Sequence, residues 1–201
     1  MTLPANPAEE PVPPAVDLLD SMEHAGARKV AAQQSVLPPG WRAADRAIVR
    51  TTEWGLFAIG ATFTLMITLE VISRYVFSFS IFFVNAAARL LLVWFFLMGA
   101  GIALRHGAHV GFELLLTSVS ARRRRAIVLV GSVLGLVFFA EMLWGGLYAL
   151  GPAWRQIEPG LGISLVWPFL AIPVGFALMI YHMVVLIYVE VRQAPDGRAR
   201  S

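Results

Sequence analysis

The chain has 201 residues, of which 58% are hydrophobic and only 14% charged, with a net charge of +3. A soluble domain is typically about 45–50% apolar and about 25% charged, so this composition indicates a membrane protein. The lack of cysteine excludes disulfides and thiol nucleophiles. The basic residues do not form the aromatic-interleaved surface of a nucleic-acid binder, so no nucleic-acid partner is expected.

The chain begins with a segment, residues 1–40, that holds seven of the twelve prolines and many alanines. A basic start followed by an apolar core is missing, so we do not expect a signal peptide. This composition predicts a disordered Pro/Ala-rich cytoplasmic tail. Residues 41–192 are then expected to form one membrane domain, followed by a short tail over 193–201.

Four long apolar stretches occupy approximately residues 54–77, 81–104, 126–150 and 162–189. Each reaches the length of about 20 residues that crosses a hydrocarbon core of about 30 Å. Because backbone groups cannot bond to water there, the sequence predicts an all-α integral membrane protein with four transmembrane helices. Pro168 and Pro173 predict a kink or an irregular start in the fourth helix.

The distribution of basic residues predicts the orientation. With four spans, thirteen of the sixteen Lys and Arg residues lie on the side that carries both termini, which is therefore expected to be cytoplasmic. Between the second and third spans, the apolar run over 110–119 predicts a short amphipathic helix in the lipid interface. The alternative is an extension of the second helix. Cytoplasmic anchoring against anionic lipid is expected from Arg122, Arg123, Arg124 and Arg125.

Ionisable residues within the spans are costly in lipid and usually face a partner or a cavity. Glu70 and Arg74 are four residues apart, which lets a helical Glu and Arg meet. Arg89 and Glu141 lie at a similar depth, so the four side chains are expected to form one polar network. One interpretation of this network is an ion pathway. The other is a set of charges that join helices or bind a partner protein, and we favour it because four helices leave little room for an aqueous path.

The histidines are considered as candidate ligands of a haem or a metal. His106 and His109 follow the second span, and His182 lies near the same end of the fourth, which would allow a haem or metal pair. Their sequence neighbourhood contains no supporting carboxylate pattern, so no cofactor or metal is expected. Motifs for a nucleophile elbow or a phosphate loop are missing too, and we do not expect an enzyme.

Three stretches resemble a known family. They are "SRYVF" (residues 73–77), "ARLLLVWFFLMGAGIALRHGAHVGFELL" (88–115) and "FLAIPVGFALMIYHMV" (169–184). In this order on four spans they are similar to the small, four-helix DctQ-like membrane subunit of tripartite ATP-independent periplasmic (TRAP) transporters, over about residues 45–190. The resemblance rests on Arg74, Tyr75, Arg89, Trp94, Gly99, Arg105, His109, Glu113, Pro173 and Gly175.

One departure from the family pattern concerns the start of the second span. The family often has an acidic pair just before the Ala-Arg sequence, where this chain has Val84-Asn85-Ala86-Ala87. Glu70 or Glu141 is therefore the expected partner of Arg89, as a hypothesis.

The resemblance implies a scaffold role in the bacterial inner membrane. A periplasmic solute-binding protein would deliver an organic acid to a large membrane subunit driven by a sodium gradient, and the small subunit would pack on the large one. Two alternatives stay open: a haem-binding anchor of a redox enzyme that uses His106 or His109 with His182, and an autonomous homodimeric transporter.

Overall fold

The computed structural model describes residues 24, 27–28, 30–31, 33–106 and 121–192. These residues are mainly helical and contain no extended sheet; one isolated bridge joins Ile157 to Ser164. The helices are α2 (Pro39–Val76), α3 (Phe82–His106), α5 (Ala121–Trp154), α6 (Val166–Phe169) and α7 (Ala171–Arg192). Four apolar helices are long enough to span a membrane, with α6 and α7 counted as one unit, Val166–Arg192. The prediction of an all-α protein with four spanning helices is confirmed.

The spanning helices are longer than the apolar stretches that predicted them. Helix α2 begins at Pro39, fifteen residues before the expected start at 54, and α5 begins at Ala121 rather than at 126. Residues 122–125 thus belong to the first turns of α5 and not to a loop. Hydropathy marks only the part of a helix that is apolar, whereas polar residues can continue the same hydrogen-bonded spiral beyond it.

The fourth span is interrupted where its prolines lie, as expected. Helix α6 ends at Phe169 and α7 begins at Ala171. Pro173 lacks the amide hydrogen that would bond to the carbonyl of Phe169, which weakens the helix at this point. Of the kink or irregular start predicted from Pro168 and Pro173, the structure shows the irregular start.

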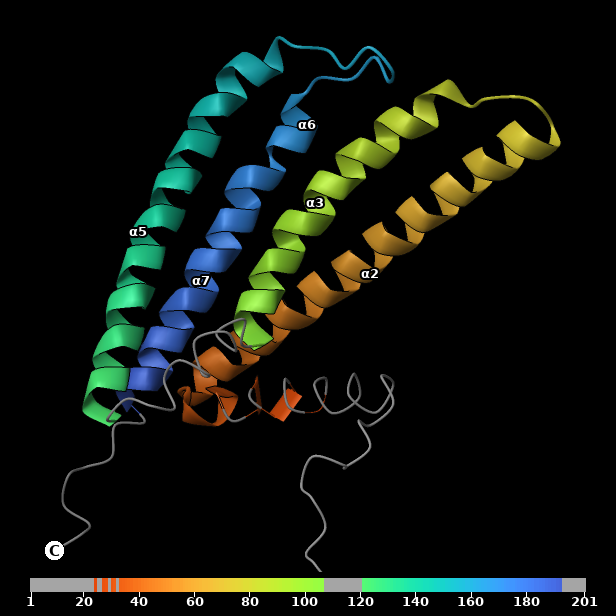
Figure 1. Cartoon of the computed structure of the whole chain (residues 1–201). Coiled ribbons are helices and arrows are strands. Elements are labelled where there is room, and N and C mark those ends of the chain that lie inside the picture. Colours follow the sequence, from red (N-terminus) through yellow and green to blue (C-terminus); the bar gives the residue numbers. More distant parts are fainter. Residues whose placement is uncertain (1–23, 25–26, 29, 32, 107–120, 193–201) are drawn as a thin grey trace, which may run out of the picture.

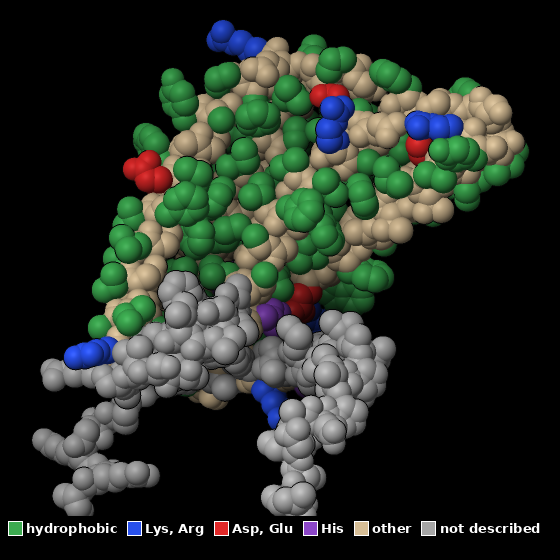
Figure 2. All heavy atoms as spheres, viewed as in Figure 1, with side chains coloured by type: hydrophobic (Ala, Val, Ile, Leu, Met, Phe, Trp, Pro, Cys, Tyr) green, Lys and Arg blue, Asp and Glu red, His purple; other side chains and the backbone are tan. Residues whose placement is uncertain are grey.

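The helices form an open layer rather than a closed bundle. Figure 1 shows α2, α3, α7 and α5 side by side in that order, and the main helix contacts follow the same sequence of neighbours. Buried residues gather on α7, which lies between α3 and α5: Ala171, Pro173, Gly175, Met179, His182, Met183, Val185 and Val189. Exposed hydrophobic side chains are spread over the layer (Figure 2).

Small residues set the spacing of the helices around α7. A Cβ atom on Gly175 would lie 2.7 Å from Cβ of Leu97 on α3. A Cβ atom on Gly146 of α5 would lie 2.7 Å from Cγ2 of Ile172. Both distances are too short for a real contact, so glycine at these positions lets α7 approach its two neighbours closely.

The layer has two distinct ends. We call the end with the connections 77–81 and 155–165 the loop end, and the end where α2 begins and α7 finishes the terminal end. At the terminal end Leu37 is 1% exposed and packs with Val185 and Val189. Residues 33–36 are helical, so this part of the expected disordered tail is ordered, because Leu37 buries its side chain against α7.

Several predicted features lie outside the described residues. These are the interfacial helix over 110–119, His109 and Glu113, the C-terminal tail, and the side chains of Arg122, Arg124 and Arg125. Arg123, the remaining member of the arginine run, is exposed.

Candidate functional site

A buried polar cluster at the terminal end is centred on Asp45 of α2. Its carboxylate accepts hydrogen bonds from Arg105 Nη2 of α3 at 2.6 Å and from Tyr181 Oη of α7 at 3.0 Å. Gln34 Nε2, from the segment before α2, donates to the same carboxylate at 3.2 Å. One carboxylate therefore joins three helices and the N-terminal segment. We call Gln34, Asp45, Arg105, Tyr181 and His182 the Asp45 cluster.

The centre of the Asp45 cluster is closed to solvent. Asp45, Arg105 and His182 are all 0% exposed. An uncompensated charge there would be costly, and the ion pair between Asp45 and Arg105 supplies the compensation. Within the described part of the chain, Nε and Nη1 of Arg105 and both ring nitrogens of His182 have no hydrogen-bond partner.

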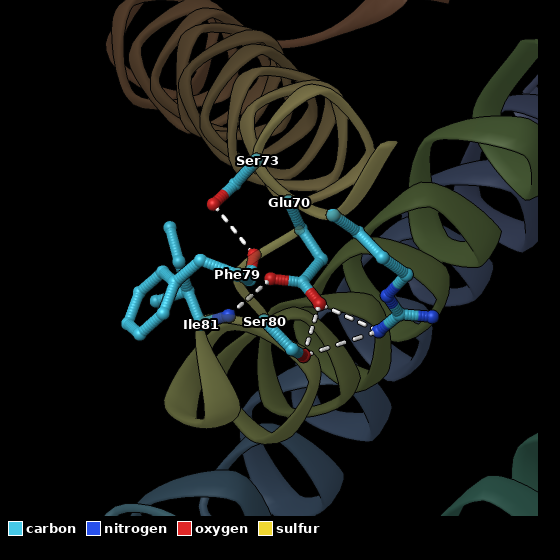
Figure 3. Close-up of polar contacts among 6 residues, drawn as sticks. Glu70, Ser73, Phe79, Ser80 and Ile81 are labelled. Atoms are coloured by element: carbon cyan, nitrogen blue, oxygen red, sulfur yellow. Dashed lines mark hydrogen bonds and ion pairs between the residues drawn. The ribbon is translucent and has the colours of Figure 1, made fainter. Parts of the chain in front are cut away.

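The second polar site lies at the loop end and is centred on Glu70 (Figure 3). Oε1 of Glu70 accepts from Arg74 Nη2 at 2.6 Å and from Ser80 Oγ at 2.9 Å, and Oε2 accepts from the backbone N–H of Ile81 at 2.9 Å. Ile81 immediately precedes α3. A carboxylate of α2 thus bonds the start of α3, where amides lack helical partners and negative charge is favourable.

The turn that brings Glu70 to α3 is tightly built. Ser73 Oγ donates to the carbonyl oxygen of Phe79 at 2.7 Å (Figure 3). The backbone N–H groups of Phe77 and Phe79 both donate to the carbonyl oxygen of Ser73. Ser78 has a φ of 53°, in the left-handed region. The chain thus reverses within a few residues, which puts Ser80 and Ile81 beside Glu70.

Glu70, Arg74, Arg89 and Glu141 do not form a single network within the chain, and their other interpretation, as charges that bind a partner protein, stays a prediction. The structure joins Glu70 to Arg74 but pairs Arg89 with Glu158 of the α5–α6 connection, at 3.1 Å. Glu141 lies exposed on α5, at the edge of the layer. Similar depth did not bring the four together, because the helices lie in a row instead of surrounding a common axis.

Four of the ten positions that carried the family resemblance lie in contacts between helices. Trp94 Nε1 donates to the carbonyl oxygen of Trp167 at 3.2 Å, and Gly99 and Gly175 lie where a Cβ atom would approach α2 and α3 respectively. Pro173 is buried, and Tyr75 is 79% exposed. These residues therefore join neighbouring helices or face outward.

Sequence reasoning missed Asp45 and Glu158. Asp45 lies before the expected start of the first span, and its partner Arg105 is 60 residues away. A signal was available: Asp45 is the one acidic residue among the basic residues Arg42, Arg46 and Arg50. Its bond to Arg105 also requires the long helix α2, which hydropathy did not reveal.

The described residues contain no group of three or more His, Asp or Glu side chains that could hold a metal. His106 Nδ1 lies 3.0 Å from the carbonyl oxygen of Ile102, one turn earlier on α3. His182 packs its ring against that of Tyr181, with centroids 5.4 Å apart. His109, the other histidine considered as a partner of His182, lies outside the described residues, so the histidine pair that the sequence raised as an alternative stays a prediction.

The fold and its charge pairs define a multi-pass helical membrane protein whose helices form a layer. A family model described as "Tripartite ATP-independent periplasmic transporters, DctQ component" matches residues 63–193. The chain belongs to this family of small TRAP permease subunits, which are transporter components and not enzymes.

Two named relatives agree with this assignment. The ectoine TRAP transporter small permease protein TeaB of Halomonas elongata is 30% identical over 111 residues, which cover 54% of this chain and 58% of the relative. The C4-dicarboxylate TRAP transporter small permease protein DctQ of Rhodobacter capsulatus is 30% identical over 95 residues, which cover 46% and 42%. The match thus spans about half the length of each relative.

Proposed function

We propose that this chain is the scaffold subunit of a TRAP transporter and packs on the large permease subunit. In this proposal the complex takes up an organic acid, delivered by a periplasmic solute-binding protein, at the expense of a sodium gradient. The observation that supports a scaffold role is the open layer of helices. A single layer has two faces but no interior, and exposed apolar side chains extend over it.

The proposed orientation places the terminal end in the cytoplasm of a bacterium whose inner membrane holds the complex. Its support is the concentration of arginines at this end: Arg42, Arg46, Arg50, Arg105, Arg123 and Arg192. The loop end, which would face the periplasm and the binding protein, has Arg74, Arg89 and Arg155. The bias toward the terminal end follows the positive-inside rule.

The proposed solute class takes its support from the relative named for C4-dicarboxylates. The other relative is named for ectoine, so subunits of similar sequence serve transporters of different solutes. We therefore assign solute choice to the binding protein and the large subunit. The carboxylates of Asp45 and Glu70 are bonded by other side chains of this chain, so in this proposal both sites serve the fold.

Reconstitution tests the proposal. Liposomes containing the large subunit, with or without this chain, are supplied with the binding protein and a radiolabelled C4-dicarboxylate under an inward sodium gradient. We expect uptake only with this chain present, and none when an inward potassium gradient replaces sodium. Uptake by this chain alone would contradict the scaffold role, and equal uptake without it would show that the chain is dispensable.

A further inference from the structure

A continuous exposed stripe runs along the side of α5 that faces away from α7. Its residues follow one another in alternating steps of four and three, and all are exposed: Val130, Leu134, Val137, Glu141, Trp144 and Tyr148. We call this stripe the α5 seam. The opposite side of α5 is buried against the layer, at Ser132, Gly146 and Ala153.

The spacing of the α5 seam is typical of a helix that packs along another helix. Steps of four and three average 3.5 residues, which keeps one row of side chains facing the same partner over many turns. Gly131 and Gly145 lie next to the seam, and a Cβ atom on either would meet no heavy atom within 4 Å. Small residues of this kind let a second helix approach closely.

Glu141 is the one charged residue in this apolar stripe and lies at the middle of its span. The span runs from Ala126 to Arg155, so Glu141 is about 21–23 Å from either end at 1.5 Å per residue. In the described part of the chain, no hydrogen bond or ion pair reaches its carboxylate. Its surroundings are Val137, Ala140 and Trp144.

A carboxylate at this depth is unfavourable against lipid and is expected to face a partner group. A second copy of the chain is a poor partner, because a two-fold axis along the membrane normal would put Glu141 opposite Glu141. Like charges in contact across an interface are strongly unfavourable. The charge of Glu141 instead requires a cationic side chain, which the described part of this chain does not place near it.

We propose that a transmembrane helix of the large permease subunit packs along the α5 seam and places a Lys or Arg side chain against Glu141. This inference rests on the proposed scaffold function and names the surface that performs it. The apolar seam residues supply the packing, and the ion pair fixes the register of the two helices. In lipid, where apolar burial drives association weakly, such a polar contact has a large share in partner choice.

Cysteine crosslinking in the intact complex tests the surface. The chain contains no cysteine, so Leu134→Cys on the seam and Leu147→Cys off it are matched single labels. Leu147 precedes the seam residue Tyr148 and is therefore turned about 100° from it around the helix. Both leucines are exposed, by 65% and 50%. After labelling with a photoactivatable maleimide in membranes that also hold the large subunit and the binding protein, products are identified by mass spectrometry.

We expect Leu134→Cys to crosslink to a helix of the large subunit and Leu147→Cys to do so at most weakly. Equal yields from the two positions would overturn the proposal, as would a product formed with a second copy of this chain. If the label crosslinks to lipid alone while the large subunit still co-purifies, the α5 seam is not the interface with the large subunit. The proposed scaffold function would be unaffected by that result. If the large subunit never co-purifies with the unaltered chain, the scaffold function itself fails.

Charge reversal tests the ion pair separately. Glu141→Lys should reduce the co-purified large subunit by about tenfold or more, because two cations would then face each other. Glu141→Gln should reduce it less. Introducing Glu at the basic residue found by crosslinking should restore binding to Glu141→Lys. Full retention of the large subunit by Glu141→Lys would overturn the ion pair, provided that the variant alone melts like the unaltered chain, as its exposed position predicts.

Discussion

The two ends of the layer each hold an arginine–carboxylate pair between distant segments, but in opposite surroundings. At the terminal end, Arg105 and Asp45 are both 0% exposed and 2.6 Å apart. At the loop end, Arg89 and Glu158 are 3.1 Å apart, and the side chain of Arg89 is 68% exposed. Each pair links helix α3 to another part of the chain. Only the first is sealed from solvent and from lipid.

This difference assigns different roles to the two ends. Removing one member of a buried pair leaves the other without compensation, which is strongly destabilising, whereas exposed pairs contribute little. The Asp45 cluster therefore holds α2, α3, α7 and the N-terminal segment in place. In the Arg89–Glu158 pair only the arginine is exposed, so the pair is expected to contribute little to the fold, and the charge of Arg89 is available at the end that we propose to face the binding protein.

The largest expected effect comes from Asp45→Ala. This change leaves the Arg105 guanidinium buried and unpaired and removes the acceptor of Tyr181 and Gln34. We expect a loss of about 3–5 kcal/mol in unfolding free energy. Thermal unfolding of the purified chain in detergent, followed by size-exclusion chromatography, measures it. The comparison between the two ends fails if Asp45→Ala melts like the unaltered chain.

A double variant that removes both charges separates the effect of an unpaired buried charge from the effect of lost packing. In Asp45→Leu with Arg105→Met, both charges are gone and apolar side chains of similar length fill the site. Such replacements of buried pairs are often neutral or stabilising. We therefore expect the double variant to melt at a higher temperature than Asp45→Ala. A double variant no more stable than Asp45→Ala would mean that the ion pair itself, and not the compensation of a buried charge, holds the end together.

Tyr181→Phe is a milder change in the same cluster. It removes the hydroxyl that donates to Asp45 at 3.0 Å and keeps the ring that packs on His182. A hydrogen bond to a charged group contributes about 1.5–3 kcal/mol, so the expected loss of stability is smaller than for Asp45→Ala. The same melting assay measures it. An effect as large as that of Asp45→Ala would show that the cluster depends on Tyr181 more than on the charge of Arg105.

The sequence predicted the features that depend on local pattern. Hydropathy located the four spans, the two prolines located the break between Phe169 and Ala171, and a spacing of four predicted that Glu70 could meet Arg74. In each case the residues that interact are close in the chain. Periodicity and residue type then suffice, because helical geometry fixes which neighbours meet.

The contacts between distant residues were not predictable in this way. No short stretch of sequence distinguishes a four-helix bundle from an open layer. The open arrangement of the helices is the reason why Arg89 meets Glu158 rather than Glu141. Asp45 was missed because its partners Arg105 and Tyr181 are 60 and 136 residues away. Such pairings depend on the order of helices in the layer, which no short motif records.

A substitution at the buried residue Glu70 tests how much the polar contacts of the loop end contribute to stability. Glu70→Gln keeps the shape of the side chain but removes the charge that faces Arg74 and the amide of Ile81. We expect a melting temperature between those of Tyr181→Phe and the unaltered chain, and faster proteolysis in the α2–α3 turn. Arg74→Ala is the matched control, because this arginine is half exposed and the bonds of Glu70 to Ser80 and Ile81 survive its loss. If Arg74→Ala has the larger effect, the ion pair rather than the bond to the start of α3 stabilises the turn.

The smallest effect on stability is expected from Arg89→Ala, at most about 1 kcal/mol, because the arginine of this pair is exposed and water can replace much of its bond to Glu158. Glu158→Ala should match it in the melting assay. If the solute-binding protein docks at the loop end, Arg89→Ala should nevertheless weaken its binding to the reconstituted complex. The loss of affinity should be larger at low salt than at high salt, whereas Tyr181→Phe should leave the affinity unchanged at both. Light scattering or surface plasmon resonance at two ionic strengths would measure this. If docking is unchanged at both ionic strengths, the Arg89–Glu158 pair has no part in binding the solute-binding protein. The two ends of the layer would then differ in stability alone.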